Sequence, residues 1–282
     1  MAAIVVLQSC CAAMKISVNR LSGPYYPLVV MALLMLAILS FSRVGLFIWQ
    51  YERVAAAADI LPLLLQGIRA DLILIGLWLV LPVLLAPVLA TAGNITRWRS
   101  YCHGWALLGL TVIIFIELST PQFILQYDIR PNRLYVEYLK YPREVFSTLW
   151  HGFRAMLLAG IVLTAVLLVL SNRVLRAAKE HTLACRNRTL WLSWPLVVCL
   201  VFAMVRSTTD HRPANPAFFA VTGDAMVNSL VISSPYSVLY AIYSLRHEAN
   251  ASEVYGKLSR QQIVSDALDW PWLQQLQFDE NY

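Results

Sequence analysis

The sequence predicts an all-α protein: a polytopic membrane bundle of about five transmembrane helices, with juxtamembrane amphipathic helices after the last span. Two observations predict this fold. Of the 282 residues, 59% are hydrophobic and only 13% are charged, whereas soluble domains are roughly 45–50% apolar. The apolar residues also come in blocks separated by charged stretches, which is typical of a chain that crosses a bilayer. Mean hydropathy is accordingly +0.61.

Five apolar blocks are predicted to span the membrane. Arg43 lies near the far end of the first, where its side chain is expected to snorkel to the interface. The second contains Pro82 and Pro87, which a spanning helix tolerates and which are expected to kink it. The last three blocks are short enough to be buried helices instead, but flanking Trp, Tyr and Arg favour spanning. The predicted spans are Tyr26–Trp49, Leu72–Thr91, His103–Leu118, Ala155–Leu170 and Leu190–Val205.

The basic residues of the short loops predict a cytoplasmic amino terminus and an extracytoplasmic carboxyl terminus, because cytoplasmic loops are enriched in Lys and Arg. The loops on the other side of the membrane also contain Lys and Arg, so the excess of basic residues on the cytoplasmic side is modest. The net charge of +6 is explained by this topology, and no nucleic-acid partner is expected. The cytoplasmic set is Lys15, Arg20, Arg97, Arg99, Arg173, Arg176, Lys179, Arg186 and Arg188, and the opposite set is Arg53, Arg69, Arg130, Arg133, Lys140 and Arg143.

The spans divide the chain into three parts: a cytoplasmic segment over 1–24, the five-helix domain over 25–206, and extracytoplasmic amphipathic helices with a truncated linker over 207–282. A signal peptide or lipoprotein box around Cys10 and Cys11 is disfavoured because no basic region precedes a very short apolar run. Met14 followed by Lys15 resembles a natural start, which makes 1–13 a candidate misassigned extension.

The sequence contains no recognisable catalytic or metal site. Its five cysteines form no Cys-x-x-Cys pair, which argues against a zinc site and a disulfide framework. The five histidines are scattered without ligand spacing. We therefore expect no catalytic residue, no metal and no cofactor in this chain.

The most distinctive polar stretch is the loop over 127–145, between the third and fourth spans. It combines guanidinium groups, carboxylates and tyrosines, a mixture suited to lipid headgroups or a docking partner. The alternative is a solvated loop whose charges pair with one another. A polar cluster joining Arg69, Asp71, Glu117 and Arg130 is a further hypothesis. The lipid-headgroup or docking candidates are Arg69, Asp71, Glu117, Asp128, Arg130, Asn132, Arg133, Tyr135, Glu137, Tyr138, Tyr141 and Arg143.

A further helix is predicted after the fifth span. Val238, Ile242 and Leu245 lie on one stripe at helical spacing, and three tyrosines lie on the adjacent stripe. Such a helix either lies on the outer leaflet or packs on the rim of the bundle. From about Ser252 onward the sequence is polar and suggests no folded domain.

Several of these segments resemble the membrane domain of lipoteichoic-acid-synthase-like proteins, which are bacterial phosphoglycerol transferases of the sulfatase and alkaline-phosphatase superfamily. The resemblance covers about residues 25–255. The segments that carry the resemblance are Asp128-Ile129-Arg130-Pro131-Asn132-Arg133, the start of the second span with Arg69 and Asp71, His211-Arg212-Pro213 and the run 235–240. It implies five membrane helices in a bacterial cytoplasmic (inner) membrane, followed by an extracytoplasmic catalytic domain.

The resemblance implies a threonine nucleophile and a manganese or magnesium ion only in that catalytic domain, which this chain does not contain. No active-site residue is carried over. A split or frameshifted gene is one hypothesis for the missing part. The expected partners are membrane phospholipids and a separately encoded sulfatase-like catalytic domain.

The leading functional hypothesis is a membrane anchor that positions a lipid headgroup for a phosphoglycerol transferase, with Arg130, Arg133 and Arg143 as phosphate ligands. Alone, this module transfers nothing. One alternative is a small permease or transporter subunit, favoured by the prolines of the second span and by Glu117. Another is a structural scaffold or nonfunctional remnant.

Overall fold

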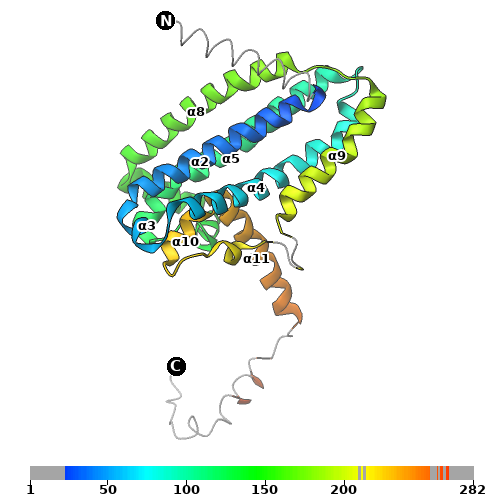
Figure 1. The fold of residues 1–282 in the computed structure, drawn as a ribbon. Coiled ribbons are helices and arrows are strands. Elements are labelled where there is room, and N and C mark those ends of the chain that lie inside the picture. The colour runs from blue at the N-terminus through cyan, green and yellow to red at the C-terminus, as the bar shows by residue number, and fades with distance from the viewer. Residues whose placement is uncertain are drawn as a thin grey trace, which may run out of the picture. The chain divides into compact units, whose positions relative to one another are not determined.

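The computed structural model describes residues 23–208, 211, 214–254, 259, 261–262 and 265–266; most of these residues are helical, and no strand is found among them. Five helices are long and apolar enough to cross a membrane (Figure 1). The prediction of an all-α membrane bundle with further helices after the last span is confirmed. The five are α2 (Tyr26–Trp49), α4 (Ile60–Leu89), α5 (Ile95–Tyr127), α8 (Arg154–His181) and α9 (Asn187–Arg206).

Shorter helices connect and follow these spans. They are η1 (Gly23–Tyr25), α3 (Tyr51–Ala57), α6 (Arg133–Tyr138), α7 (Pro142–Gly152), η2 (Pro216–Phe219), α10 (Ala225–Val231) and α11 (Ser234–Val254). By its contacts the chain divides into two units, residues 1–240 and 241–282. All contacts discussed below lie within the first unit. Residues 1–22 of the predicted cytoplasmic segment over 1–24 and most of the polar tail lie outside the described residues.

Three of the spans extend well beyond their predicted bounds. α4 begins at Ile60 rather than Leu72, and α5 has 33 residues, which makes it about 50 Å long. The predicted spans were too short because apolar runs stop at charged residues, whereas helical hydrogen bonding continues past them. α4 also continues through Pro82 and Pro87.

Indole groups from neighbouring helices replace the hydrogen bonds that these two prolines remove. Proline has no N–H, so the carbonyl four residues earlier loses its helical donor. For Pro82 that carbonyl is Trp78 O, which accepts from Trp105 Nε1 of α5 at 3.0 Å. For Pro87 it is Val83 O, which accepts from Trp194 Nε1 of α9 at 2.8 Å. The prolines thus create acceptors that fix α5 and α9 against α4.

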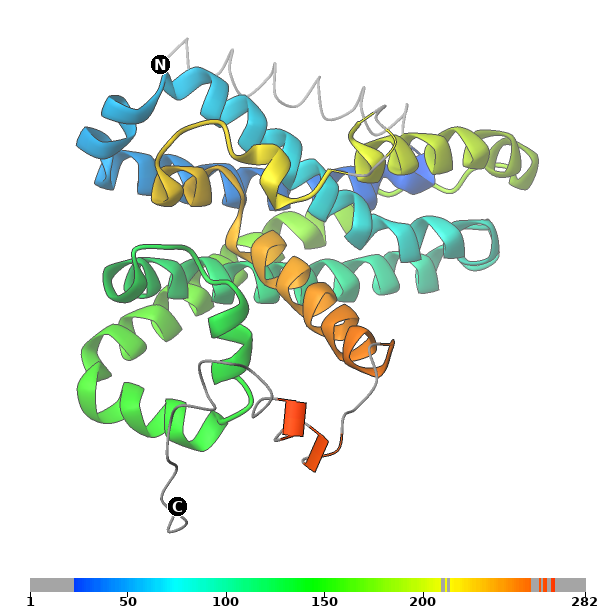
Figure 2. The ribbon, with the colours of Figure 1, turned by 90° about the horizontal axis from the view of Figure 1, so that it is seen from below.

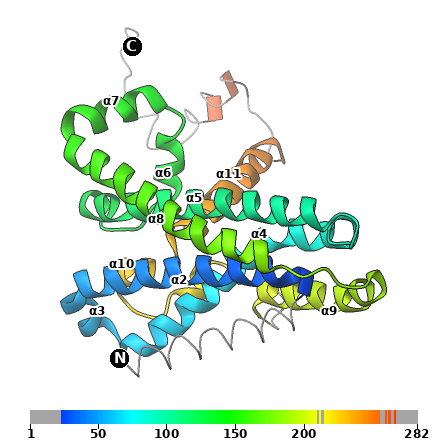
Figure 3. The ribbon, with the colours of Figure 1, turned by 90° about the horizontal axis from the view of Figure 1, so that it is seen from above.

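The centre of the bundle is α2, which contacts α4, α5 and α8, while α9 packs on α4 and α8 packs on α5 (Figures 1 and 3). In the most apolar windows of α4 and α5, 44% of residues are buried inside the protein, against 6% in α8 and 11% in α9. The core therefore lies between α2, α4 and α5. Gly109 of α5 allows side chains of α2 and α4 to approach this helix closely, since a Cβ there would overlap Met35 and Trp78.

The bundle has two ends. At the near end, defined by Gly23 and the loops over 90–94 and 182–186, Trp98 Nε1 donates to Pro24 O at 2.7 Å and Arg99 donates to Thr182 O. The far end comprises residues 50–59, 128–153, 207–208 and 214–240. Figure 2 shows α10 at the far end, where it contacts α2, α3 and α4.

The helix predicted after the fifth span is present as α11. It follows α10 with a bend of 102°, and the two together are apolar enough to form a broken span or a re-entrant loop. Tyr236 and Val238 are buried, and the Tyr236 hydroxyl donates to Ala214 O at 3.3 Å. The first turns of α11 therefore pack on the bundle.

Candidate functional site

Four charged side chains are buried together at the far end. Arg43 on α2 pairs with Asp71 on α4 at 2.7 Å, and Arg130, in the loop after α5, pairs with Glu117 on α5 at 3.2 Å. None of the four side chains is more than 4% exposed. We call this group the buried quartet. Its charges cancel, so no net charge is placed in the low-dielectric interior.

Arg43 corrects one expectation of the sequence analysis. Its side chain does not snorkel to the interface: it points into the protein, where Nη2 binds Asp71 and Nε donates to Val231 O at 3.0 Å. Gly67 makes this possible, because a Cβ at that position would overlap the guanidinium. Gly67 and Asp71 are four residues apart, so one face of α4 supplies both the space and the counter-charge.

Glu117 joins three segments of the far end. Its carboxylate accepts from Arg130 Nη1, from Ser42 Oγ of α2, and from the backbone N–H of Ser234 at 2.9 Å. Ser234 is the first residue of α11, so a carboxylate lies at a helix N-terminus, where the helix dipole favours negative charge. Ser234 Oγ is also 2.7 Å from Thr120 Oγ1.

Several polar atoms of the buried quartet and its surroundings have no hydrogen-bond partner among the described residues. Most buried polar atoms in proteins do have a partner. The buried quartet therefore keeps polar atoms that no described group satisfies. The atoms are Arg43 Nη1, Asp71 Oδ2, Arg130 Nε, Arg130 Nη2 and Ser233 Oγ.

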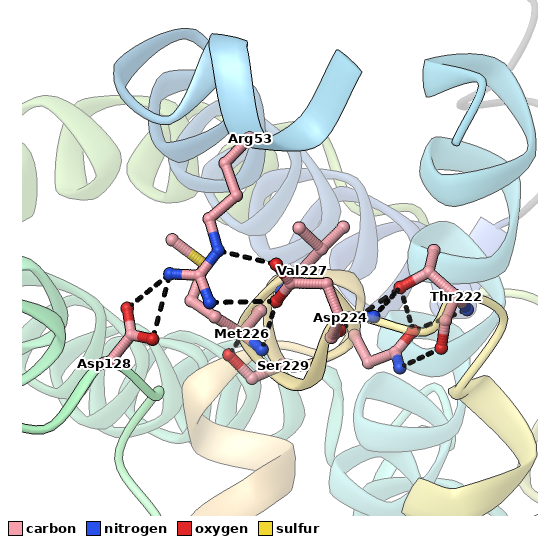
Figure 4. A network of polar contacts seen from close by, with 8 residues as sticks. Arg53, Asp128, Thr222, Asp224, Met226, Val227 and Ser229 are labelled. Atoms are coloured by element: carbon pink, nitrogen blue, oxygen red, sulfur yellow. Dashed lines mark hydrogen bonds and ion pairs between the residues drawn. The ribbon is translucent and has the colours of Figure 1, made fainter. Parts of the chain in front are cut away.

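A second polar network ties the far-end segments together at the surface (Figure 4). Arg53 of α3 binds both oxygens of Asp128, at 2.7 and 2.9 Å. It also binds both oxygens of Asp224, at 2.6 and 3.1 Å. Asp224 is the N-cap of α10 and accepts from the N–H groups of Met226 and Val227. One guanidinium thus links the segments before α4, after α5 and after α9.

This network shifts the pKa values of its members in the expected directions. The hydrogen bonds from Arg53 hold the pKa of the Asp224 carboxyl below its ordinary value. Hydrogen bonds to Asp224 and Asp128 raise the pKa of Arg53. Asp128 has a φ of 53° and is the C-cap of α5; Asp is one of the residues that tolerates this left-handed region.

The loop over 127–145 supplies fewer surface groups than expected. Arg130 is buried against Glu117, which corrects its assignment as a headgroup ligand. Asn132 caps α6 by accepting from Leu134 N at 3.0 Å, and Arg133 pairs with Glu137 at 2.9 Å. Much of the loop is therefore paired internally.

The tyrosines of the same loop occupy two environments. Tyr135 packs edge-on against Phe123, and burial raises the pKa of its hydroxyl. The hydroxyl of Tyr138 is 2.6 Å from that of Tyr127. Tyr141 is 62% exposed, and Arg143, at the start of α7, is exposed as well. Tyr141 and Arg143 are thus presented at the surface, as is Asp128, which pairs with Arg53.

The strongest amphipathic feature is α7, which the sequence analysis did not single out. At 100° per residue, Val145, Phe146, Leu149 and Trp150 fall on one face. Arg143, Glu144, Ser147, Thr148 and His151 fall on the opposite face. No residue of α7 is buried, although Phe146 and Trp150 stack on each other. Figure 3 shows α7 beside α8 and away from the rest of the bundle.

Arg69 lies outside the buried quartet, which corrects the predicted grouping with Asp71, Glu117 and Arg130. Its Nε donates to Ser207 O and Ser207 Oγ, both at 3.0 Å, and its guanidinium lies 4.5 Å from the centre of the Phe218 ring. It lines a cleft between α4 and the end of α9.

Sequence reasoning gave no role in the polar networks to Arg43, Gly67, Ser42, Ser234, Arg53 and Asp224. Two signals pointed to some of them. Gly67 and Asp71 have i, i+4 spacing, and Asp224 directly precedes an apolar run, as an N-cap does. The other partners are remote in sequence, and no local pattern links Arg43 to Val231.

The described residues hold no group of three or more His, Cys, Asp and Glu placed to bind a metal ion. Comparison with models of known protein families finds no family that matches the chain. Comparison with solved structures also finds no match.

Proposed function

We propose that this chain is the membrane anchor of a phosphoglycerol-transferase-type protein and that it positions a lipid headgroup for a catalytic domain outside this chain. In this proposal the bundle lies in a bacterial cytoplasmic membrane with its far end on the outer side. Any manganese or magnesium belongs to the catalytic domain. Support comes from the resemblance of the loop at 128–133 and from the geometry of the far end.

The observation that carries the proposal is α7. An exposed helix with segregated apolar and polar faces lies in the membrane interface, with its apolar face in the headgroup and acyl boundary. Phe146 is 58% exposed and Trp150 is 38% exposed, and neither ring has a place in the core. On the polar face, Arg143 is at the level where lipid phosphates lie, which suits a guanidinium group.

The rest of the far end supports α7 by holding its loop in place. The buried quartet fixes Arg130, which precedes α6 and α7, and Arg53 links Asp128 to Asp224 of the α10 segment. The chain that would lead to a catalytic domain leaves the bundle at Ser234, whose N–H bonds to Glu117 of the same end. In this arrangement Arg143 and Tyr141 contact the headgroup, Arg133 contributes from α6, and Arg130 positions the loop.

A reconstituted transfer assay tests the proposal. The full chain is placed in nanodiscs containing phosphatidylglycerol, and a separately expressed catalytic domain of the resembled family is added with Mn²⁺. We expect transfer of phosphoglycerol to exceed that of the catalytic domain on empty nanodiscs. Arg143→Gln is expected to lower this gain, whereas Arg173→Gln, at the other end of the bundle, leaves it unchanged. Equal transfer with and without the chain would refute the proposal.

A small permease remains the second candidate, favoured by the buried quartet. Ionisable groups inside membrane spans commonly mark paths for ions or protons, and the quartet retains unpartnered polar atoms. Proteoliposomes loaded with a pH-sensitive dye distinguish the two functions. A proton flux that Glu117→Gln abolishes would favour the permease, and no flux above empty liposomes would favour the anchor.

A further inference from the structure

The cleft between α4 and α9 is placed at the membrane interface by the length of α9. This helix has 20 residues and ends at Arg206, so it is about 30 Å long at 1.5 Å per residue. The hydrocarbon core of a bilayer is also about 30 Å thick. Arg206 therefore lies at the boundary with the headgroups, and Arg69 lies at the same depth because it bonds to Ser207.

The walls of this cleft are cationic and aromatic. The cleft is shallow and open to its surroundings, with a volume of about 680 Å³. Phe202 is 67% exposed one helical turn from Arg206, on the side of the bilayer core. The lining residues are Arg69, Phe202, Arg206, Ser207, Thr208 and Phe218, with Ala203 between them.

Arg69 is held ready for an anion. Arg43, Arg53, Arg130 and Arg133 at the same end all have carboxylate partners, whereas no described carboxylate pairs with Arg69. Ser207 and the Phe218 ring fix its guanidinium, and no described group accepts from its Nη1. Ser207 Oγ accepts from Arg69 Nε, which leaves the hydroxyl hydrogen of Ser207 available to a ligand oxygen.

We infer that this cleft binds the phosphate of an anionic glycerophospholipid as a resident lipid. Arg69 and Arg206 contact the phosphodiester, since guanidinium forks match phosphate oxygens, and Ser207 donates a further hydrogen bond. Phe202 and Ala203 contact the first methylenes of an acyl chain. This inference adds a second lipid site, separate from α7, and rests on the proposed function only in placing the far end at a membrane interface.

Native mass spectrometry of the full chain, released from nanodiscs, tests the inference. We expect the cleft to retain one phosphatidylglycerol molecule in preference to phosphatidylcholine, and the Arg143→Gln variant, which lacks the α7 contact, to retain it as well. Arg69→Gln and Arg206→Gln are each expected to lower retention about tenfold, the usual effect of losing one charge-assisted contact. Arg69→Lys keeps the charge and is expected to restore part of the retention. The matched control is Arg173→Gln, an exposed arginine of α8 at the other end of the bundle and remote from both lipid sites.

The outcomes separate the possible ligands and the two proposals. Inorganic phosphate is titrated into lipid-free protein in detergent; if it saturates the cleft while phosphatidylglycerol is not retained, the lipid assignment is wrong. Equal retention by Arg69→Gln and the native protein, with both folded by circular dichroism, also overturns it. If the transfer assay fails but lipid retention still depends on Arg69, only the proposed function is rejected. If transfer succeeds but retention does not depend on Arg69, only the lipid site in the cleft is rejected.

Discussion

The pairing of Pro87 with Trp194 gives a sharp test of how the bundle is held together. In the native protein the Val83 carbonyl lacks its helical donor and accepts from Trp194 Nε1 at 2.8 Å. Trp194→Phe keeps an aromatic ring at this position and removes the N–H. Pro87→Ala restores the helical N–H, so that Val83 O no longer depends on α9.

The expected magnitude follows from the state of the carbonyl in each variant. Interhelical hydrogen bonds in membranes contribute about 0.6 kcal/mol on average and up to about 1.7 kcal/mol, and an unpaired buried acceptor costs about 1–3 kcal/mol. Trp194→Phe should therefore destabilise the native protein by about 1–2 kcal/mol. In the Pro87→Ala background it should cost only the altered packing, which leaves a coupling of about 1 kcal/mol.

The four proteins of this double-mutant cycle are unfolded with SDS in mixed micelles and followed by circular dichroism. Trp49→Phe, paired with Pro87→Ala, provides the control, because Trp49 is on α2, is 44% exposed, and makes no hydrogen bond to Val83. The effects of this control substitution and of Pro87→Ala on the free energy of unfolding should add. A coupling below about 0.3 kcal/mol for Trp194, within the usual scatter of additive pairs, would refute the assignment of Trp194 as the replacement donor.

Three further predictions concern the far end. Gly67→Ala should destabilise the bundle by about 1–3 kcal/mol in SDS unfolding because its Cβ displaces Arg43, whereas Gly45→Ala, with open space around it, should be neutral or stabilising; equal effects would contradict this packing. Glu117→Ala should cost about 3–5 kcal/mol by leaving Arg130 charged and unpaired, and Glu117→Leu with Arg130→Met should cost much less; a double variant as unstable as the single one would argue against an ion pair. Because the pKa of Asp224 is lower in the folded protein, its contribution to stability is present above the unfolded value of about 3.9 and is lost as pH falls through the folded value. Midpoints of thermal unfolding between about pH 5 and 2 should thus fall more steeply for the native protein than for Asp224→Asn, and identical slopes would exclude this contribution.

The site was less predictable than the spans, and particular residues show why. Glu117 stood out because a carboxylate near the end of an apolar block is costly and needs a partner, and Asp71 because it lies at the entry to the second predicted span. The identity of that partner was not readable, since Arg43 is 28 residues from Asp71 in sequence, and Ser234 is 117 residues from Glu117. Arg69, only two residues from Asp71, was the nearest cation in the chain and yet bonds to Ser207 instead.

Local composition by itself determined that this chain is helical and crosses a membrane with five apolar segments, because transfer of apolar side chains into lipid and internal backbone hydrogen bonding act on each segment separately. Tertiary structure alone decided which charges pair in the interior, which carbonyls the prolines leave for Trp105 and Trp194, and that Arg69 faces a cleft. Those outcomes depend on which helices lie side by side, and that is set by packing between residues far apart in the chain.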